Sequence, residues 1–151
     1  MKSTTYESDF LLWSEQQAAA LRTGNLAALD TEGLIEELES MGNSDRRALR
    51  SQFSNILEHL LKLQFSNSTE PHSKWMGELR RFRMEAHGLY VDEPGIVRYQ
   101  DDLFAKAWKL GLEAAEANFR DYKENVALPR ECPYTIDQVL DYSFIPRRSK
   151  D

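Results

Sequence analysis

Residues 29–62 decide the fold of this 151-residue chain, and they read LDTEGLIEELESMGNSDRRALRSQFSNILEHLLK. Apolar side chains recur in this stretch at spacings of three and four residues, which gathers them on one face of an α-helix: they are Leu34, Leu38, Met41, Leu49, Phe53, Ile56, Leu57 and Leu60. Asp30 and Ser44 are residue types that cap helix N-termini, and Gly42 suits the left-handed conformation in which helices often end. The stretch therefore predicts a helical hairpin, with one helix ending at Gly42 and the next running from Ser44 to near Phe65.

The same periodicity outside this stretch predicts four further helices. They run from Tyr6 to Thr23, from Ser73 to Leu89, from about Pro94 towards Tyr122, and briefly after Thr135, where Thr135 and Gln138 have capping-box spacing. Short connections between helices favour antiparallel neighbours. We expect an all-α fold, a single-domain bundle of about five to six mostly antiparallel helices over residues 1–151, with short disordered ends at 1–4 and 147–151.

The composition is that of an ordinary folded protein. A chain of 17.5 kDa with 41% hydrophobic residues is large enough for one core. The only cysteine is Cys132, and the chain starts with polar residues where a signal peptide would have an apolar run. No apolar stretch approaches the roughly 20 residues that span a bilayer. We expect a cytoplasmic protein with no membrane segment.

Net charge makes nucleic acid a disfavoured partner. The formal charge is −6, which opposes the attraction to phosphates that general nucleic-acid binding requires. Arg80, Arg81 and Arg83 are the densest basic group, but they spread around a helix instead of sharing one face. A solvated basic surface is the simpler interpretation of these three arginines.

Three glutamates in residues 29–42 are candidate metal ligands. Glu32, Glu36 and Glu39 fall within about 60° of one another on a helix, opposite the apolar face. Carboxylates repel one another by a few tenths of a kcal/mol at such spacings, a cost that a divalent cation or a basic partner would offset. The alternative is a solvated acidic face with no ligand.

Glu37 and His59 are the candidate catalytic residues. Each lies beside the apolar face of its predicted helix, so the two side chains would meet if the helices formed a hairpin. A carboxylate partner would hold one tautomer of the histidine, as a general base or a metal ligand requires. A structural hydrogen bond at the edge of the core is the alternative. Neither the Glu-x-x-His pairs of di-iron bundles nor a zinc motif is found.

Several segments together resemble the family catalogued as domain of unknown function twenty-nine, small helical proteins especially abundant in cyanobacteria. The segments that carry the resemblance are Tyr6–Phe10 with Trp13, Leu29–Gly42, Ser44–Leu49, Leu57–Gln64, Ser73–Trp75 and Cys132–Thr135. The chain departs from the family after Trp75, where members often continue with arginine and glutamine. The resemblance implies a helical fold in a bacterial cytosol, and it brings no activity, cofactor or catalytic residue with it.

No spacing in the chain is that of an established catalytic motif. We therefore expect a small cytosolic interaction or regulatory module that binds another protein or a second copy of itself. The alternative is a metal-dependent enzyme, or a metal or small-molecule binder, that uses Glu32, Glu36, Glu37, Glu39 and His59.

Overall fold

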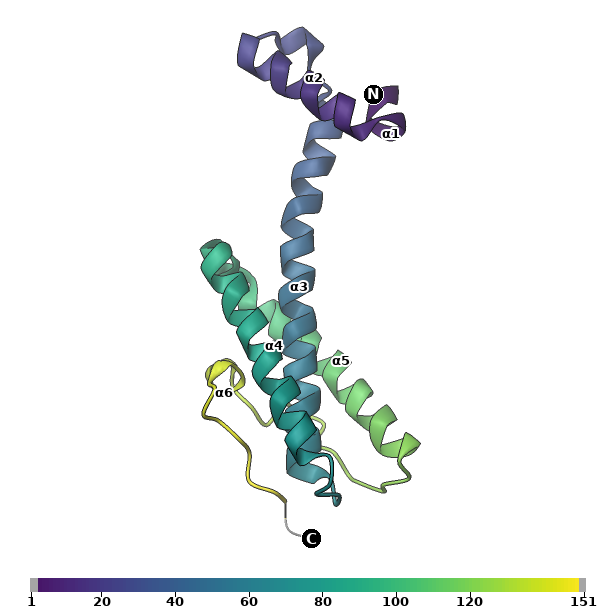
Figure 1. Ribbon diagram of the computed structural model, residues 1–151, viewed down its shortest axis with the longest axis vertical. Coiled ribbons are helices and arrows are strands. Elements are labelled where there is room, and N and C mark those ends of the chain that lie inside the picture. Colours follow the sequence, from purple (N-terminus) through teal and green to yellow (C-terminus); the bar gives the residue numbers. More distant parts are fainter. Residues whose placement is uncertain (1–2, 150–151) are drawn as a thin grey trace. The chain divides into compact units, whose positions relative to one another are not determined.

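The computed structural model describes residues 3–149, and all the regular secondary structure in that range is helical. This confirms the all-α prediction. The helices are α1 (Thr4–Ser8), α2 (Phe10–Thr23), α3 (Thr31–Phe65), α4 (His72–Asp92), α5 (Gln100–Asp121) and α6 (Ile136–Leu140), with 3-10 turns η1 (Leu26–Ala28) and η2 (Pro94–Tyr99) (Figure 1). No helix of the described range is long and apolar enough to cross a bilayer.

The chain divides into two compact units, residues 1–44 and residues 45–151. The expectation that the whole chain is one domain stays a prediction. Of the ends expected to be disordered, residues 1–2 and 150–151 lie outside the described range. Thr4 already begins α1, and the backbone N–H of Ser149 donates to the Gln64 carbonyl at 2.7 Å.

The predicted hairpin is wrong, because α3 is one continuous helix of 35 residues. Gly42 and Ser44, expected to end one helix and cap the next, lie inside it. A glycine costs about 1 kcal/mol in a helix interior, and asparagine, serine and aspartate cost a few tenths each. A break would instead leave unpaired backbone groups at two new helix ends. The continuous helix pairs these groups along its own backbone and is therefore favoured.

The first unit contains two short helices and the N-terminal part of α3. The expected helix from Tyr6 is interrupted at Asp9, whose carboxylate accepts a hydrogen bond from the Leu12 amide at 3.0 Å and so caps α2. α2 ends at Thr23, as predicted, and Gly24 follows it in the left-handed conformation (φ 69°).

Asp30 holds the first unit together. It caps α3 as predicted, since its Oδ1 accepts from the Gly33 amide at 3.1 Å. Its Oδ2 also accepts from the indole of Trp13 and from the backbone of Ser3, both at 2.9 Å. The Gln17 side chain accepts from the Asp30 amide at 2.7 Å. The hydrogen bonds that the carboxylate accepts from Ser3, Gly33 and Trp13 lower the pKa of Asp30, with the Ser3 amide the largest cause.

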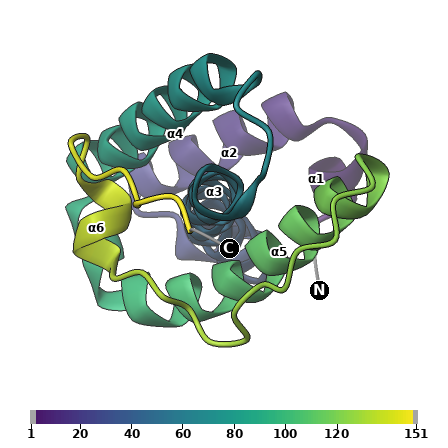
Figure 2. The same ribbon diagram turned by 90° about the horizontal axis from the view of Figure 1, so that it is seen from below.

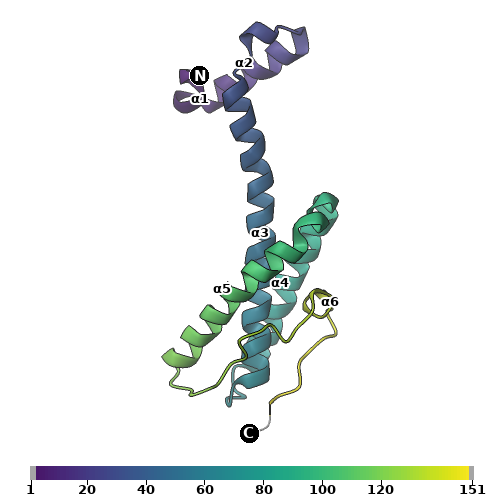
Figure 3. The same ribbon diagram turned by 180° about the vertical axis from the view of Figure 1, so that it is seen from behind.

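The second unit is built around the C-terminal half of α3. Figures 2 and 3 show this half of α3 with α4 and α5 packed on different sides of it, each running antiparallel to the one before. Phe53, Leu57 and Leu60 are fully buried at its centre. Gly111 lets α5 approach closely, because a side-chain carbon there would lie 2.9 Å from the Ser54 carbonyl oxygen. Trp75 and Trp108 are also buried in this unit.

The C-terminal segment packs against this bundle through α6. The capping box of Thr135 and Gln138 forms as predicted. Arg83 of α4 is buried, and its guanidinium donates to the carbonyls of Val139 at 2.8 Å and Gln138 at 3.1 Å. His87 of α4 adds a contact to the end of α6, with its Nε2 2.7 Å from the Leu140 carbonyl oxygen, so Arg83 and His87 together tie α6 to α4.

Candidate functional site

The glutamates predicted as metal ligands lie on the N-terminal part of α3. Glu32, Glu36 and Glu39 are all exposed. Within residues 3–149 no three histidine, cysteine, aspartate or glutamate side chains are grouped so that they could hold a metal ion. A divalent cation at these positions stays a prediction.

Glu37 and His59 do not form the predicted pair. They lie 22 positions apart on one helix, and each has another partner. The Tyr6 hydroxyl donates to Glu37 Oε2 at 3.1 Å, and His59 Nε2 lies 2.5 Å from Glu78 Oε2. The expectation that the two side chains meet depended on a turn at Gly42, which the continuous helix removes.

Beside the glutamates, α3 carries large apolar side chains that nothing in residues 3–44 covers fully. Leu38 is 67% exposed, Met41 60% and Ile35 51%, whereas Leu34 is half-buried. We call these four residues the α3 stripe. Single exposed apolar residues are common on proteins, but a contiguous group marks an interaction surface or an aggregation risk. Leu34, Leu38 and Met41 were predicted to form the apolar face of one helix of a hairpin, and that hairpin does not form because α3 is continuous.

The chain's negative charge is concentrated in the unit that carries the α3 stripe. Residues 1–44 contain eight acidic and two basic side chains, a net charge of −6. Residues 45–151 contain seventeen of each and are neutral overall. The whole formal charge of the chain therefore belongs to the first 44 residues.

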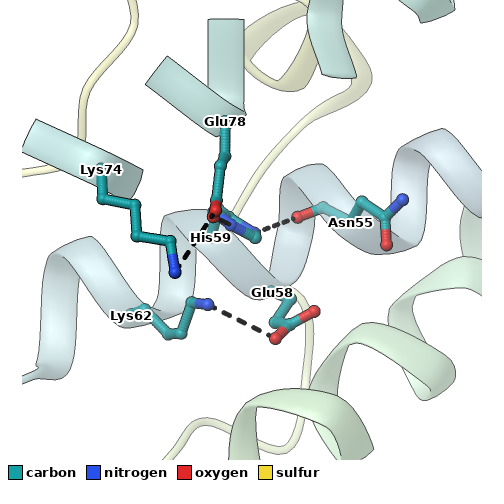
Figure 4. Close-up of polar contacts among 6 residues, drawn as sticks. All are labelled: Asn55, Glu58, His59, Lys62, Lys74 and Glu78. Carbon is teal, nitrogen blue, oxygen red and sulfur yellow. Dashed lines mark hydrogen bonds and ion pairs between the residues drawn. The ribbon is translucent and has the colours of Figure 1, made fainter. Parts of the chain in front are cut away.

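His59 is the centre of a polar cluster in the second unit, drawn in Figure 4. Its ring is buried between α3 and α4, edge-on to Phe82. Nδ1 lies 2.9 Å from the Asn55 carbonyl oxygen, which can only accept, so Nδ1 carries a proton. Nε2 faces the Glu78 carboxylate, and Lys74 adds a weaker ion pair to Glu78 at 3.9 Å. The hydrogen bond from His59 is the main reason that the pKa of Glu78 is lowered.

This arrangement leaves the imidazole occupied by the protein itself. Nδ1 faces the Asn55 carbonyl oxygen and Nε2 faces the Glu78 carboxylate, so both ring nitrogens have partners within the protein. A metal ion or a substrate proton would have to displace one of these two contacts to reach the ring. The contact with Glu78 ties α3 to α4, which agrees with the structural alternative for His59.

Lys62, one turn beyond His59, is buried although it is a lysine. Its ammonium lies 3.5 Å from Glu58 Oε1 and 5.3 Å from the centre of the Trp75 ring, a cation–π distance. The sequence analysis singled out neither Lys62 nor Glu78. The available signal was the charged Lys62 within the apolar run Leu60–Leu63, because a charge in such a run needs a partner.

The arginine group does not form a basic surface patch. Arg80 and Arg81 are exposed, but Arg83 is buried against α6 and cannot reach a phosphate. Burial lowers the pKa of Arg83 to about 10. Of the three arginines, only Arg80 and Arg81 are therefore exposed.

A shallow cavity of about 430 Å³ opens in the first unit. Its lining residues are Ser3, Gln16, Gln17, Ala28, Leu29 and Asp30. The Asp30 carboxylate already accepts three hydrogen bonds from the protein, and Gln17 is bonded to the Asp30 amide. The side chains of Asp30 and Gln17 in the cavity wall therefore already form hydrogen bonds that stabilise the fold.

A family model described as Domain of unknown function DUF29 matches residues 5–145, which is nearly the whole chain. The chain belongs to the DUF29 family. The match confirms the resemblance given by the glutamate-rich segment and the tryptophan segments. Comparisons with curated proteins and with solved structures returned no match. The family assignment carries no activity, so any function of this DUF29 protein must be argued from its own surface.

Proposed function

We propose that this DUF29 protein is an interaction module that binds another protein through the first unit, with the α3 stripe as the contact surface. The observation that carries the proposal is the exposure of Ile35, Leu38 and Met41 on consecutive turns of one helix. Burying apolar area against a partner is favourable by about 25 cal/mol per Å². Such a surface on a helix is a common site for helix binding.

The residues around the stripe support a preformed surface. Asp30 fixes the start of α3 with hydrogen bonds to α2 and to Ser3, and Tyr6 bonds Glu37 within the stripe's border. A partner would therefore meet an ordered helix, and little conformational entropy would be lost on this side of the interface.

The enzyme alternative has lost its main support, since Glu37 and His59 bond to different residues.

We place the interaction in the cytoplasm, because the chain's one cysteine, Cys132, has no other cysteine of the chain to pair with.

The test compares proteins retained from a lysate by wild type and by two double variants, quantified by mass spectrometry. The stripe variant is Leu38→Ser/Met41→Ser. The control variant is Val91→Ser/Tyr122→Ser, which removes two exposed apolar residues of the second unit. We expect a defined set of proteins to be retained by wild type and control and lost by the stripe variant. Equal retention by all three would refute the proposal.

A further inference from the structure

We infer that the partner segment that binds the α3 stripe is a basic amphipathic helix of another protein. This inference rests on the proposed function and specifies the chemistry of the partner. It follows from the shape of the stripe and from the charges at its borders.

The stripe has the dimensions of a helix-binding surface. At 100° per residue, Met41, Leu34, Leu38 and Ile35 span about 120° of the α3 circumference, and they extend over about 11 Å of its axis. This is two turns of one face. A second helix packed along it would place its own apolar residues at spacings of three and four against these four side chains.

Both borders of the stripe are acidic. Glu37 lies about 40° from Met41 on one side, and Glu39 lies about 40° from Ile35 on the other, with Glu32 beyond it. The partner's residues that flank its apolar face would meet these carboxylates at the rim of the interface. Lysine and arginine there would be attracted, and aspartate and glutamate would be repelled.

The charge of the first unit separates this partner from two others. A second copy docked stripe against stripe would bring one charge of −6 towards another. An anionic membrane surface would also meet like charge, and the stripe has no basic border to offset it. Of these three partners, only a basic helix is attracted both by the apolar side chains of the stripe and by the carboxylates at its borders.

The experiment measures binding of labelled 18-residue peptides to the full-length protein by fluorescence anisotropy. The first peptide places leucine on one helical face and lysine elsewhere. The second replaces each lysine with glutamate, and the third has the composition of the first in an order that removes the apolar face. We expect the first to bind at least about tenfold more tightly than the other two, and to weaken as salt rises.

The variants show whether the peptide binds at the stripe. Leu38→Ser/Met41→Ser should weaken binding of the lysine peptide about tenfold, whereas Val91→Ser/Tyr122→Ser should leave it unchanged. Glu32→Gln/Glu39→Gln should weaken it less and reduce its salt dependence. Because all these residues are exposed, the variants should keep the wild-type circular dichroism spectrum. Equal effects of the stripe and control variants would overturn the inference.

Three other outcomes would each overturn it in a distinguishable way. Preference for the glutamate peptide would mean a partner of the opposite charge. Dimers in sedimentation that the stripe variant loses would mean that a second copy of the chain binds the stripe. Binding to vesicles of anionic lipid that the stripe variant loses would mean that the stripe binds a membrane. If lysate proteins are lost with the stripe variant while the lysine peptide does not bind, the interaction function stands and the basic helix is wrong. If neither depends on the stripe, both proposals fail.

Discussion

Arg83 offers a quantitative test of how α6 is held in place. Replacing it with methionine keeps an unbranched apolar chain and removes the donors to the carbonyls of Val139 and Gln138. A hydrogen bond from a charged group contributes about 1.5–3 kcal/mol, so the two together contribute about 3–6 kcal/mol. The buried charge has its own cost, reported by the lowered pKa of Arg83. We therefore expect Arg83→Met to reduce the free energy of unfolding by about 2–3 kcal/mol.

The assay is urea-induced unfolding followed by circular dichroism, with hydrogen exchange of the amides in α6 measured in parallel. Arg80→Met is the matched control, because Arg80 lies on the same helix and is exposed. It should change the free energy of unfolding by less than about 0.5 kcal/mol. In Arg83→Met, exchange should accelerate in α6 more than in the centre of α3. Equal losses in the two variants, or an unchanged exchange rate in α6, would refute this account of Arg83.

Three further predictions concern other contacts. Gly111→Ala should destabilise the protein by about 1–3 kcal/mol in urea unfolding, because the added methyl meets the α3 backbone; a stabilised variant would contradict the close packing. Since the pKa of Glu78 is lowered in the folded protein, its contribution to stability is present above its unfolded value near 4.5 and is lost as the pH falls through the folded value. Glu78→Gln should therefore flatten the acid side of the stability profile, and a profile parallel to wild type would exclude the His59 pair. Gly33→Ala should lower the melting temperature despite the better helix propensity of alanine, because its methyl would overlap the Asp30 carboxylate, which three hydrogen bonds hold in place; an unchanged melting temperature would show that the carboxylate can move.

Local signals in the sequence were sufficient to predict many of the helix ends. Asp30, Gly24 and the pair Thr135–Gln138 act where predicted, because each satisfies or ends backbone hydrogen bonding within a few residues. The α4 helix begins one residue before the expected Ser73. Hydrogen bonds between residues close in sequence are enough to determine such helix ends.

The break at Gly42 could not be judged from the same kind of signal. Gly42 to Asp45 has the composition of a helix boundary, but whether a helix ends there depends on whether the two halves can pack together. Ile35, Leu38 and Met41 before Gly42 remain exposed, and the apolar side chains from Leu49 onward pack with α4 and α5. An amphipathic pattern predicts an apolar face without stating what covers it.

Only part of the candidate site could be predicted, because the sequence pattern does not show which helices pack together. The sequence placed the glutamates and His59 on helices correctly, but the partner of His59 is Glu78 on α4, a contact between positions far apart in the chain. Arg83 was grouped with its neighbours by sequence, whereas its burial depends on α6, more than 50 residues away. Residue spacing within one helix does not report contacts with another.

Photo-crosslinking from position 38 would identify the segment that binds the α3 stripe. A crosslinking amino acid would replace Leu38 in one protein and Val91 in a control, and the crosslinked peptides would be identified by mass spectrometry after exposure to lysate. We expect crosslinks from position 38 to a segment of another protein that has apolar residues at helical spacing and flanking lysine or arginine, and none of that kind from position 91. Crosslinks to an acidic segment or to a second copy of this chain, or equal products from both positions, would contradict it.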